Sequence, residues 1–313
     1  MLKAKALKPG DVIGIIAPAS ASQSELRDQK INGSIRYFES LGYRVELGKH
    51  IRSERGYLGG EDSDRLSDLH AMFTNKKIRA IFYIRGGYGS ARLLPEINYD
   101  LIRRNPKILV GYSDATALFN AIYKNTGLQS LFFGPMPGVD IWNGFDPFAE
   151  ECLWRALTSN KPFGKLPARD NEIEIYSRKK YSAEGKMIGG NLAVFSAIMG
   201  TPFSPSVKNR TLLFEDVGEN IYRIDRYLAQ LRAAGVLDSA KAILLGQFTD
   251  CKPKENSPSL TLEEVFEDYF GKLKIPVLKN LPFGHIPRQW TVPLGAKMRV
   301  EGNTISITES VLQ

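Results

Sequence analysis

The sequence contains few of the residues that build metal sites and disulfides. Its two cysteines, Cys152 and Cys251, lie far apart and form no CxxC pattern, so neither a disulfide framework nor a cysteine cluster is indicated. It has three histidines and no HExxH motif. We therefore expect no metal and no cofactor in the functional site.

Long apolar segments are also missing. No apolar run approaches the ~18 residues that a membrane span requires. The first ten residues contain lysines but no apolar core of a signal peptide. We therefore expect a cytoplasmic protein with no membrane partner.

Positive charge is in modest excess, and the basic residues are scattered along the chain. The chain has 42 Lys and Arg against 34 Asp and Glu, for a net charge of +8, and its longest basic run is Arg178-Lys179-Lys180. No zinc-finger, homeodomain or RNA-binding signature occurs, so we expect no nucleic-acid partner. A mildly basic, solvated surface is the favoured interpretation, and it is compatible with a small anionic substrate.

The first half of the 313-residue chain alternates apolar strands with helices. Strands are predicted at 12–17, 43–47, 78–84 and 107–111, and helices end near Gly42 and Gly127. This alternation, joined by short glycine-rich turns, predicts an α/β fold with parallel strands covered by helices.

The second half is mixed. Residues 135–182 are rich in Pro, Gly, Asn and charge and show one short helix at 149–157. Strands are predicted at 211–214 and 242–248, helices at 221–231 and 261–270, and a hairpin over 297–307. We expect an N-terminal domain at 1–150, a linker at 151–182 and a smaller C-terminal domain at 183–313.

Ser113 is the most informative residue of the chain. It follows the apolar strand in Lys107-Ile108-Leu109-Val110-Gly111-Tyr112-Ser113-Asp114-Ala115. A serine at a sharp strand-to-helix turn presents its hydroxyl, and the turn directs backbone N–H groups at whatever the hydroxyl attacks. The alternative is that Ser113 simply caps the following helix.

A nucleophilic serine needs a base, and only three histidines are available. His70 lies in a predicted helix, where we expect a half-buried structural residue, and His50 lies in a charged segment, where we expect an exposed side chain. His285 lies in Asn280-Leu281-Pro282-Phe283-Gly284-His285-Ile286-Pro287, where two prolines and a glycine restrain the loop. By elimination His285 is the predicted base.

Several acids could orient that histidine, and backbone amides could hold an oxyanion. Glu215, Asp216 and Glu219 all follow the strand at 211–214, and the residues alone do not choose among them. The N–H of Asp114 and an N–H of the turn Gly86-Gly87-Tyr88-Gly89, most naturally Gly87, are the predicted oxyanion donors. The alternative for this turn is a phosphate cradle, although it lacks the GKS/T of a P-loop.

The combined motifs resemble the LD-carboxypeptidase family of serine peptidases, which includes murein tetrapeptide carboxypeptidases and microcin C immunity peptidases. The resemblance runs from Pro9-Gly10-Asp11 to the final hairpin. The motifs that carry it, in chain order, are Gly111-Tyr112-Ser113-Asp114, Gly189-Gly190-Asn191-Leu192, Phe214-Glu215-Asp216-Val217-Gly218-Glu219, Tyr222-Arg223-Ile224-Asp225-Arg226, Gly284-His285 and Pro293-Leu294-Gly295.

The resemblance implies a catalytic triad of Ser113, Glu215 and His285, with Glu215 chosen over the other acids. It also implies an oxyanion hole from the N–H groups of Gly87 and Asp114. The implied fold is a flavodoxin-like or amidotransferase-like N-terminal domain and a smaller swivelling α/β domain, in a homodimer. The implied activity releases D-alanine from the murein tetrapeptide in peptidoglycan recycling.

The sequence leaves two alternative functions open. The first is an immunity-type peptidase acting on an aminoacyl nucleotide; such members are expected to carry an aromatic-bearing loop, and Trp142 and Trp290 have no assigned role. The second is a catalytically silent peptide-binding protein. Arg85 and Arg288 are candidates for binding a substrate carboxylate, although a structural role is favoured for both.

Overall fold

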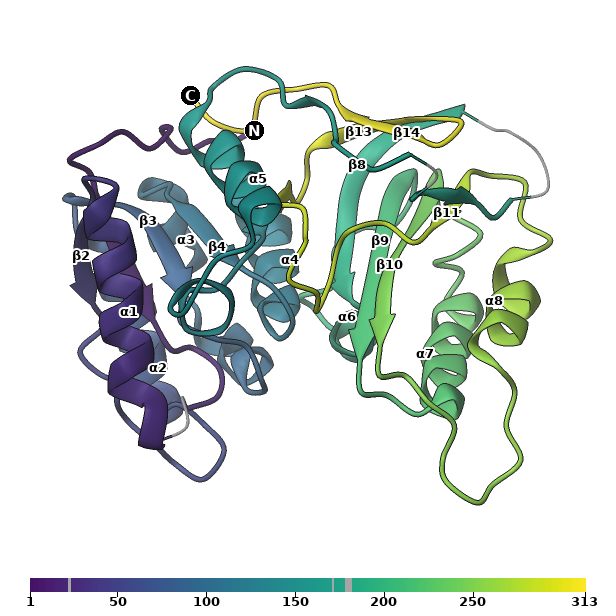
Figure 1. Ribbon diagram of the computed structural model, residues 1–313, viewed down its shortest axis with the longest axis horizontal. Helices are drawn as coiled ribbons and strands as arrows, with labels where there is room; N and C mark the ends of the chain where they lie inside the picture. The colour runs from purple at the N-terminus through teal and green to yellow at the C-terminus, as the bar shows by residue number, and fades with distance from the viewer. Residues whose placement is uncertain (22–23, 171, 178–181) are drawn as a thin grey trace.

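The computed structural model describes residues 1–21, 24–170, 172–177 and 182–313. The basic run Arg178-Lys179-Lys180 lies outside these residues. The described chain forms two sheets that stand on either side of helix α4 (Ala115–Thr126) (Figure 1).

The first sheet has six strands in the order β12-β5-β4-β3-β1-β2. Five are parallel and the sixth, β12, runs antiparallel to β5. The parallel order β2-β1-β3-β4-β5 is that of flavodoxin-like sheets, which bind ligands at the carboxyl ends of their strands. The bounds are β1 Val12–Ile16, β2 Arg44–Leu47, β3 Ile78–Tyr83, β4 Ile108–Gly111, β5 Leu131–Phe133 and β12 Val292–Pro293.

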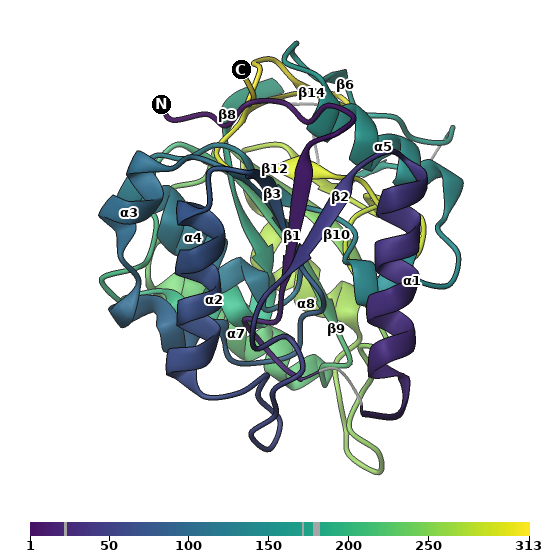
Figure 2. The ribbon, with the colours of Figure 1, turned by 90° about the vertical axis from the view of Figure 1, so that its left-hand side faces the viewer.

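Helices cover both faces of this sheet, as alternation of strands and helices predicts. Figure 2 shows α1 and α5 on one face and α2, α3 and α4 on the other. Short 3₁₀ turns η1 and η2 and a π-helical turn η3 complete this half. The bounds are α1 Arg27–Ser40, α2 Asp62–Thr74, α3 Tyr99–Arg104, α5 Pro147–Thr158, η1 Ser24–Leu26, η2 Ser90–Glu96 and η3 Pro137–Ile141.

The second sheet has eight strands in the order β6-β14-β13-β8-β9-β10-β11-β7. Its centre, β8 to β11, is parallel, and its outer strands are antiparallel. The strands are β6 Gly164–Lys165, β7 Glu174–Ile175, β8 Ser182–Asn191, β9 Arg210–Val217, β10 Ala242–Thr249, β11 Val277–Lys279, β13 Lys297–Glu301 and β14 Thr304–Ile307; the helices are α6 Leu192–Ile198, α7 Ile221–Ala233 and α8 Leu262–Phe270. The α/β prediction is thus confirmed for both halves.

Some predictions of individual strands, turns and connections are confirmed, and others are wrong. The capping box of Thr261 and Glu264 and the β13–β14 hairpin are confirmed. The strand predicted at 211–214 is too short, because β9 runs to Val217 and pairs with both β8 and β10 along its length. Residues 151–182 contain most of α5 and the edge strands β6 and β7, in addition to connecting chain.

Direct contacts join the two halves. Asn120 Nδ2 on α4 donates to the carbonyl of Gly189 (2.8 Å), and the N–H of Asn191 donates to Thr116 Oγ1 (2.9 Å). Asn191 is also in register with Glu215 on β9. The helix that follows Ser113 is therefore anchored to the strand pair that carries Glu215.

Candidate active site

Ser113 occupies a strained turn between β4 and α4. Its φ is +61°, a left-handed conformation that costs a non-glycine residue roughly 1–2 kcal/mol. Helix α4 begins after Asp114, which makes no side-chain capping bond. Within the described residues, Ser113 Oγ has no hydrogen-bond partner. Helix capping therefore does not account for this serine.

The glycine-rich turn after β3 lies against Ser113. A Cβ on Gly86 would stand 2.9 Å from Ser113 Cβ and 3.2 Å from its Oγ. Ser20 holds the turn on one side: the N–H of Tyr88 donates to Ser20 Oγ (3.0 Å). On the other side the N–H of Ser90 donates to Asp114 Oδ2 (2.8 Å). Burial raises the pKa of Asp114, and hydrogen bonds from Ser90 act in the opposite direction.

A buried arginine braces the same turn. Arg65 on α2 is 1% exposed, and its guanidinium donates to the carbonyls of Gly89 (3.0 Å) and Pro18 (2.5 Å) and pairs with Asp62. Charged groups are buried at this level only when they are paired. Arg65 therefore ties the loop after β1 to the loop after β3.

Two backbone N–H groups of this region are without acceptors. In the part of the chain that the structure describes, neither the N–H of Gly87 nor that of Asp114 donates a hydrogen bond. The turn leads into the 3₁₀ segment η2 rather than an α-helix, so the helix dipole that a phosphate cradle would use is absent there. The two amides remain as candidate oxyanion donors.

Substitution of Gly86 by alanine tests this close packing. We expect kcat to fall by about 10²-fold, because displacing a reacting group by about 1 Å costs that much. Gly86 is not among the residues with positive φ, so alanine adds no backbone strain there, and the free energy of unfolding should fall only by the roughly 1–3 kcal/mol of an overpacked contact. Turnover and urea unfolding measured on the same preparation separate the two effects; unchanged kcat would contradict the described contact.

His285 and Glu215 form the second half of the site. Nδ1 of His285 lies 2.7 Å from Oε2 of Glu215, whose side chain is 1% exposed, whereas the imidazole is 19% exposed. Gly284 makes room for the bond, because a Cβ there would lie 2.8 Å from Glu215 Oε2. The loop is pinned through its backbone: Gln247 N–H donates to Phe283 O, and Trp290 N–H to Pro282 O.

The other two candidate acids have different partners. Successive residues of a strand face opposite sides, so Asp216 points away from Glu215. It accepts from Asn191 Nδ2 (2.9 Å) and from the N–H of Ala193 (3.0 Å). Burial raises its pKa to about 6. Glu219 accepts from the Tyr227 hydroxyl. Only Glu215 among the three reaches His285 in the described residues.

The environment of His285 favours its protonated form. Burial lowers the pKa of His285, but the hydrogen bond to Glu215 and the charges of Glu215, Asp216 and Asp140 raise it by more. The net pKa is above that of a free histidine. An imidazole that is oriented at Nδ1 by a buried carboxylate leaves Nε2 for proton transfer.

The other histidines lie outside this site. His50 Nδ1 is 3.1 Å from Asp68 Oδ1, so the predicted exposure is only partly correct. His70 accepts the N–H of Asn98 at Nε2 (3.0 Å), and its half-buried position in α2 agrees with the prediction. Both histidines have structural partners.

The elbow and the histidine loop meet through Tyr112. Its ring packs edge-on against the imidazole of His285, with ring centroids 5.0 Å apart. No hydrogen bond joins Ser113 Oγ to His285 within the described residues. Catalytic hydrogen bonds of this type often shorten only when substrate binds.

Asp140 is a site residue that the sequence did not reveal. It lies on η3, in a Pro- and Gly-rich segment with no periodic pattern. Its carboxylate accepts from the Tyr112 hydroxyl (3.3 Å) and from Gln289 Nε2 (3.4 Å). Only the three-dimensional structure brings these three segments together.

The unassigned arginines and tryptophans have structural contacts. Arg85 donates to the carbonyl of Ala21 (3.0 Å), and Arg288 pairs with Glu172 (2.5 Å). Trp290 is 1% exposed and donates to Pro167 O. Trp142 packs near α1, with Lys30 over its ring. None of these four contacts is with a triad residue.

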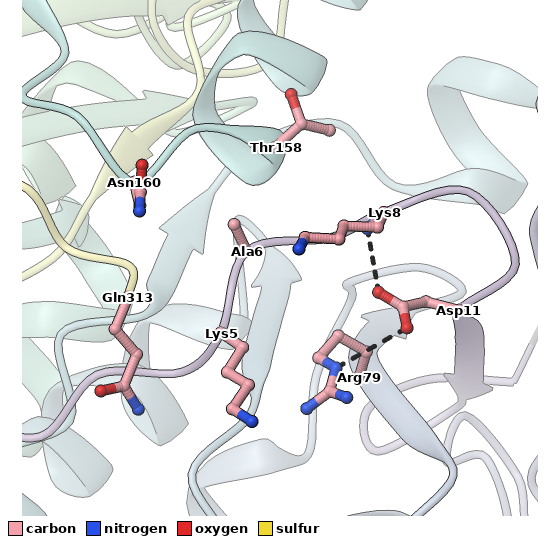
Figure 3. Close-up of a pocket in the computed structure, with 8 residues that line it drawn as sticks. All are labelled: Lys5, Ala6, Lys8, Asp11, Arg79, Thr158, Asn160 and Gln313. Carbon is pink, nitrogen blue, oxygen red and sulfur yellow. Dashed lines mark hydrogen bonds and ion pairs between the residues drawn. The ribbon is translucent and has the colours of Figure 1, made fainter.

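A pocket lined by Lys5, Lys8 and Asp11 lies away from this site. It has a volume of about 770 Å³ and opens at the amino ends of β1 and β3, the sheet edge opposite to Ser113. Figure 3 shows Asp11 between the backbone of Lys8 and the guanidinium of Arg79, with Lys5 nearby.

In the described ranges no cluster of His, Cys, Asp or Glu is suited to a metal ion. No described helix has the length and apolarity to span a membrane.

Comparisons with known proteins assign both halves of the chain to one family. Residues 13–134 match the LD-carboxypeptidase N-terminal domain and residues 184–300 match the LD-carboxypeptidase C-terminal domain. A probable murein peptide carboxypeptidase of Bacillus subtilis is 39% identical, covering 94% of this chain and 90% of that protein. The murein tetrapeptide carboxypeptidase of Pseudomonas aeruginosa is 32% identical, covering 94% of each chain.

A second kind of relative is equally well covered. The microcin C7 self-immunity protein MccF of Escherichia coli is 31% identical, covering 99% of this chain and 97% of that protein. A solved structure of MccF in complex with glutamyl sulfamoyl guanosine has a TM-score of 0.90 at 27% identity and covers 100% of both chains. By sequence and by fold, this chain belongs to the LD-carboxypeptidase family of serine peptidases.

Proposed function

We propose that this enzyme is a carboxypeptidase that cleaves the L,D-amide bond of a murein tetrapeptide and releases the terminal D-alanine. The observation that carries the proposal is the buried Glu215–His285 hydrogen bond beside a serine held at positive φ. The names of the Bacillus and Pseudomonas relatives support the substrate.

In this proposal Ser113 is the nucleophile and His285 the base. His285 Nε2 accepts the Ser113 proton as Oγ attacks the scissile carbonyl, and the imidazolium then protonates the departing D-alanine nitrogen. The N–H groups of Gly87 and Asp114 stabilise the oxyanion. Water, deprotonated by the same histidine, releases the acyl group from Ser113.

The pH dependence follows from the raised pKa of His285. The base must be neutral, so kcat/KM should fall as pH decreases through a pKa above the ~6.5 of a free histidine. Stability has the opposite dependence. Because the pKa is raised on folding, the Glu215–His285 pair contributes stability that is fully present below the unfolded-state pKa and is lost as pH rises through the folded-state pKa.

Activity and urea unfolding measured from mildly acidic to mildly alkaline pH would test both trends. An acid limb of kcat/KM centred below the pKa of a free histidine would contradict the assignment of His285.

The immunity-type activity is the second candidate, because MccF is a relative of similar identity. Its expected aromatic contact has no equivalent at Trp142 or Trp290, whose positions are structural. The exposed aromatic pair Tyr57 and Tyr88, with ring centroids 5.6 Å apart, lies at the glycine-rich turn instead. Because of this exposed aromatic pair, a nucleoside conjugate is included among the substrates to be tested.

The deciding experiment follows product masses. The protein is incubated with murein tri-, tetra- and pentapeptides and with an aminoacyl sulfamoyl nucleoside. Release of D-alanine from the tetrapeptide alone supports the murein activity. Cleavage of the nucleoside conjugate alone would establish the immunity-type activity, and binding without cleavage of either would indicate a binding protein.

We also propose the remaining features that the family resemblance implies: a cytoplasmic homodimer in peptidoglycan recycling, with domains at 1–150 and 183–313 joined by 151–182. Light scattering on the purified protein would test the homodimer, and cell fractionation would test the cytoplasmic location. Limited proteolysis within 151–182 would test the boundaries.

A further inference from the structure

Three segments that are distant in sequence converge on Asp140. Its Oδ2 accepts the N–H of Met136 (2.7 Å), which fixes the carboxylate on η3. Its Oδ1 accepts from the hydroxyl of Tyr112 at the elbow and from the amide of Gln289 after the histidine loop. Tyr112 and Gln289 are 4% and 1% exposed. The network is therefore a buried link between the two halves of the site.

The two side chains that donate hydrogen bonds to Asp140, Gln289 and Tyr112, both act on His285. Gln289 Nε2 donates to Asp140 and also to the carbonyl of Ile286 (3.1 Å), the residue directly after His285. The Tyr112 ring, whose hydroxyl is held by Asp140, packs against the imidazole. Asp140 thereby restrains the backbone beside His285 and the ring that contacts its side chain.

Asp140 also contributes charge. The ionisable groups that interact with the imidazole are Glu215 and Asp216 from β9 and Asp140 from η3. Burial raises the pKa of Asp140 to about 6, while its hydrogen bonds and the charge of His285 act in the opposite direction. The carboxylate charge of Asp140 favours the imidazolium of His285, and the imidazolium in turn favours the charged carboxylate.

We propose that Asp140 is a positioning residue for His285, holding the histidine loop against the serine elbow through Gln289 and Tyr112 and adding a second carboxylate charge to that of Glu215. This inference rests on the proposed role of His285 as the base. Both oxygens of Asp140 already accept hydrogen bonds from the protein, which separates this role from direct binding of substrate.

The test is Asp140→Asn, read by NMR titration of the imidazole protons. The chain has only three histidines, so the His285 signal is identified by its loss in His285→Gln. We expect the pKa of His285 and the acid limb of kcat/KM to shift together to lower pH. We also expect kcat to fall by up to about 10²-fold, the cost of misplacing a reacting group by about 1 Å, with KM unchanged.

Asp146→Asn is the matched control. This variant makes the same change in the same β5–α5 connection, at the N-cap of α5. Asparagine caps a helix as well as aspartate does. We therefore expect His285 to titrate as in the unmodified protein. An unchanged His285 titration in Asp140→Asn would overturn the proposal, and so would a raised KM with unchanged kcat.

A second variant keeps the proposal testable if Asp140→Asn does not fold. Gln289→Met removes the amide that links Asp140 to Ile286 and keeps an unbranched side chain of similar length. We expect kcat to fall with KM unchanged; unchanged kcat would overturn the proposal. The titration requires no turnover, so it still reports on Asp140 if Ser113→Ala proves active and the proposed function fails.

Discussion

Ser113→Ala should abolish peptide cleavage, with kcat reduced by about 10⁴-fold or more, the scale seen when a triad nucleophile is removed. The fold should be unaffected. Alanine meets the same left-handed φ of +61° as serine, and Ser113 Oγ has no hydrogen bond to lose within the described residues. The measurements are D-alanine release by mass spectrometry and urea unfolding.

Two comparisons sharpen this test. Ser113→Gly should be equally inactive but more stable by roughly 1 kcal/mol, because glycine adopts positive φ without steric cost. A fluorophosphonate probe should label Ser113 in the unmodified protein and fail to label either variant. Retained turnover in Ser113→Ala would remove the nucleophile assignment, and absent labelling would favour a non-catalytic binding protein.

Glu215→Gln should lower kcat by about 10⁴-fold while preserving the fold, since loss of the orienting acid costs a triad on this scale. The change is nearly isosteric in a site where the side chain is 1% exposed. It removes the negative charge that stabilises the imidazolium, so the pKa of His285 should fall and the acid limb of kcat/KM should move to lower pH.

Glu219→Gln is the matched control for that variant. Glu219 lies only four residues away and was an equal candidate on sequence grounds, but it bonds Tyr227 instead of His285. We expect its activity to stay close to that of the unmodified protein, because the half-buried Glu219 side chain contacts Tyr227 and Arg223 and no residue of the proposed triad. If the two variants lose activity equally, the geometry of the Glu215–His285 pair does not carry the function.

The sequence predicted those parts of the site that depend on local chemistry. The elbow at Ser113 follows from an apolar strand, a glycine and a helical pattern, and His285 follows from the scarcity of histidine. The choice among Glu215, Asp216 and Glu219 depended on the family resemblance. The residues alone could not make it, because strand β9 was predicted to end at Phe214, whereas it continues through Val217 and places Glu215 and Asp216 on opposite faces.

Other features depend on long-range pairing, and no local pattern contains them. Strand β8 includes Gly185, Gly189 and Gly190, which weaken any strand prediction. Strands β6, β7 and β12 have two residues each and are defined by their partners. Asp140 becomes informative only when Tyr112 and Gln289 are seen beside it, 28 and 149 positions away along the chain.

The pairing of β12 with β5 also has a consequence for biosynthesis. Val292 and Pro293 complete the edge of the first sheet beside Phe133 and Phe132, and about 160 residues of chain must be made between them. At the usual ~5–20 residues per second, that edge stays open for roughly 10–30 s on the ribosome. His285 emerges in the same late stretch. The nascent enzyme is thus both inactive and exposed to β-strand aggregation until its final segment closes the sheet.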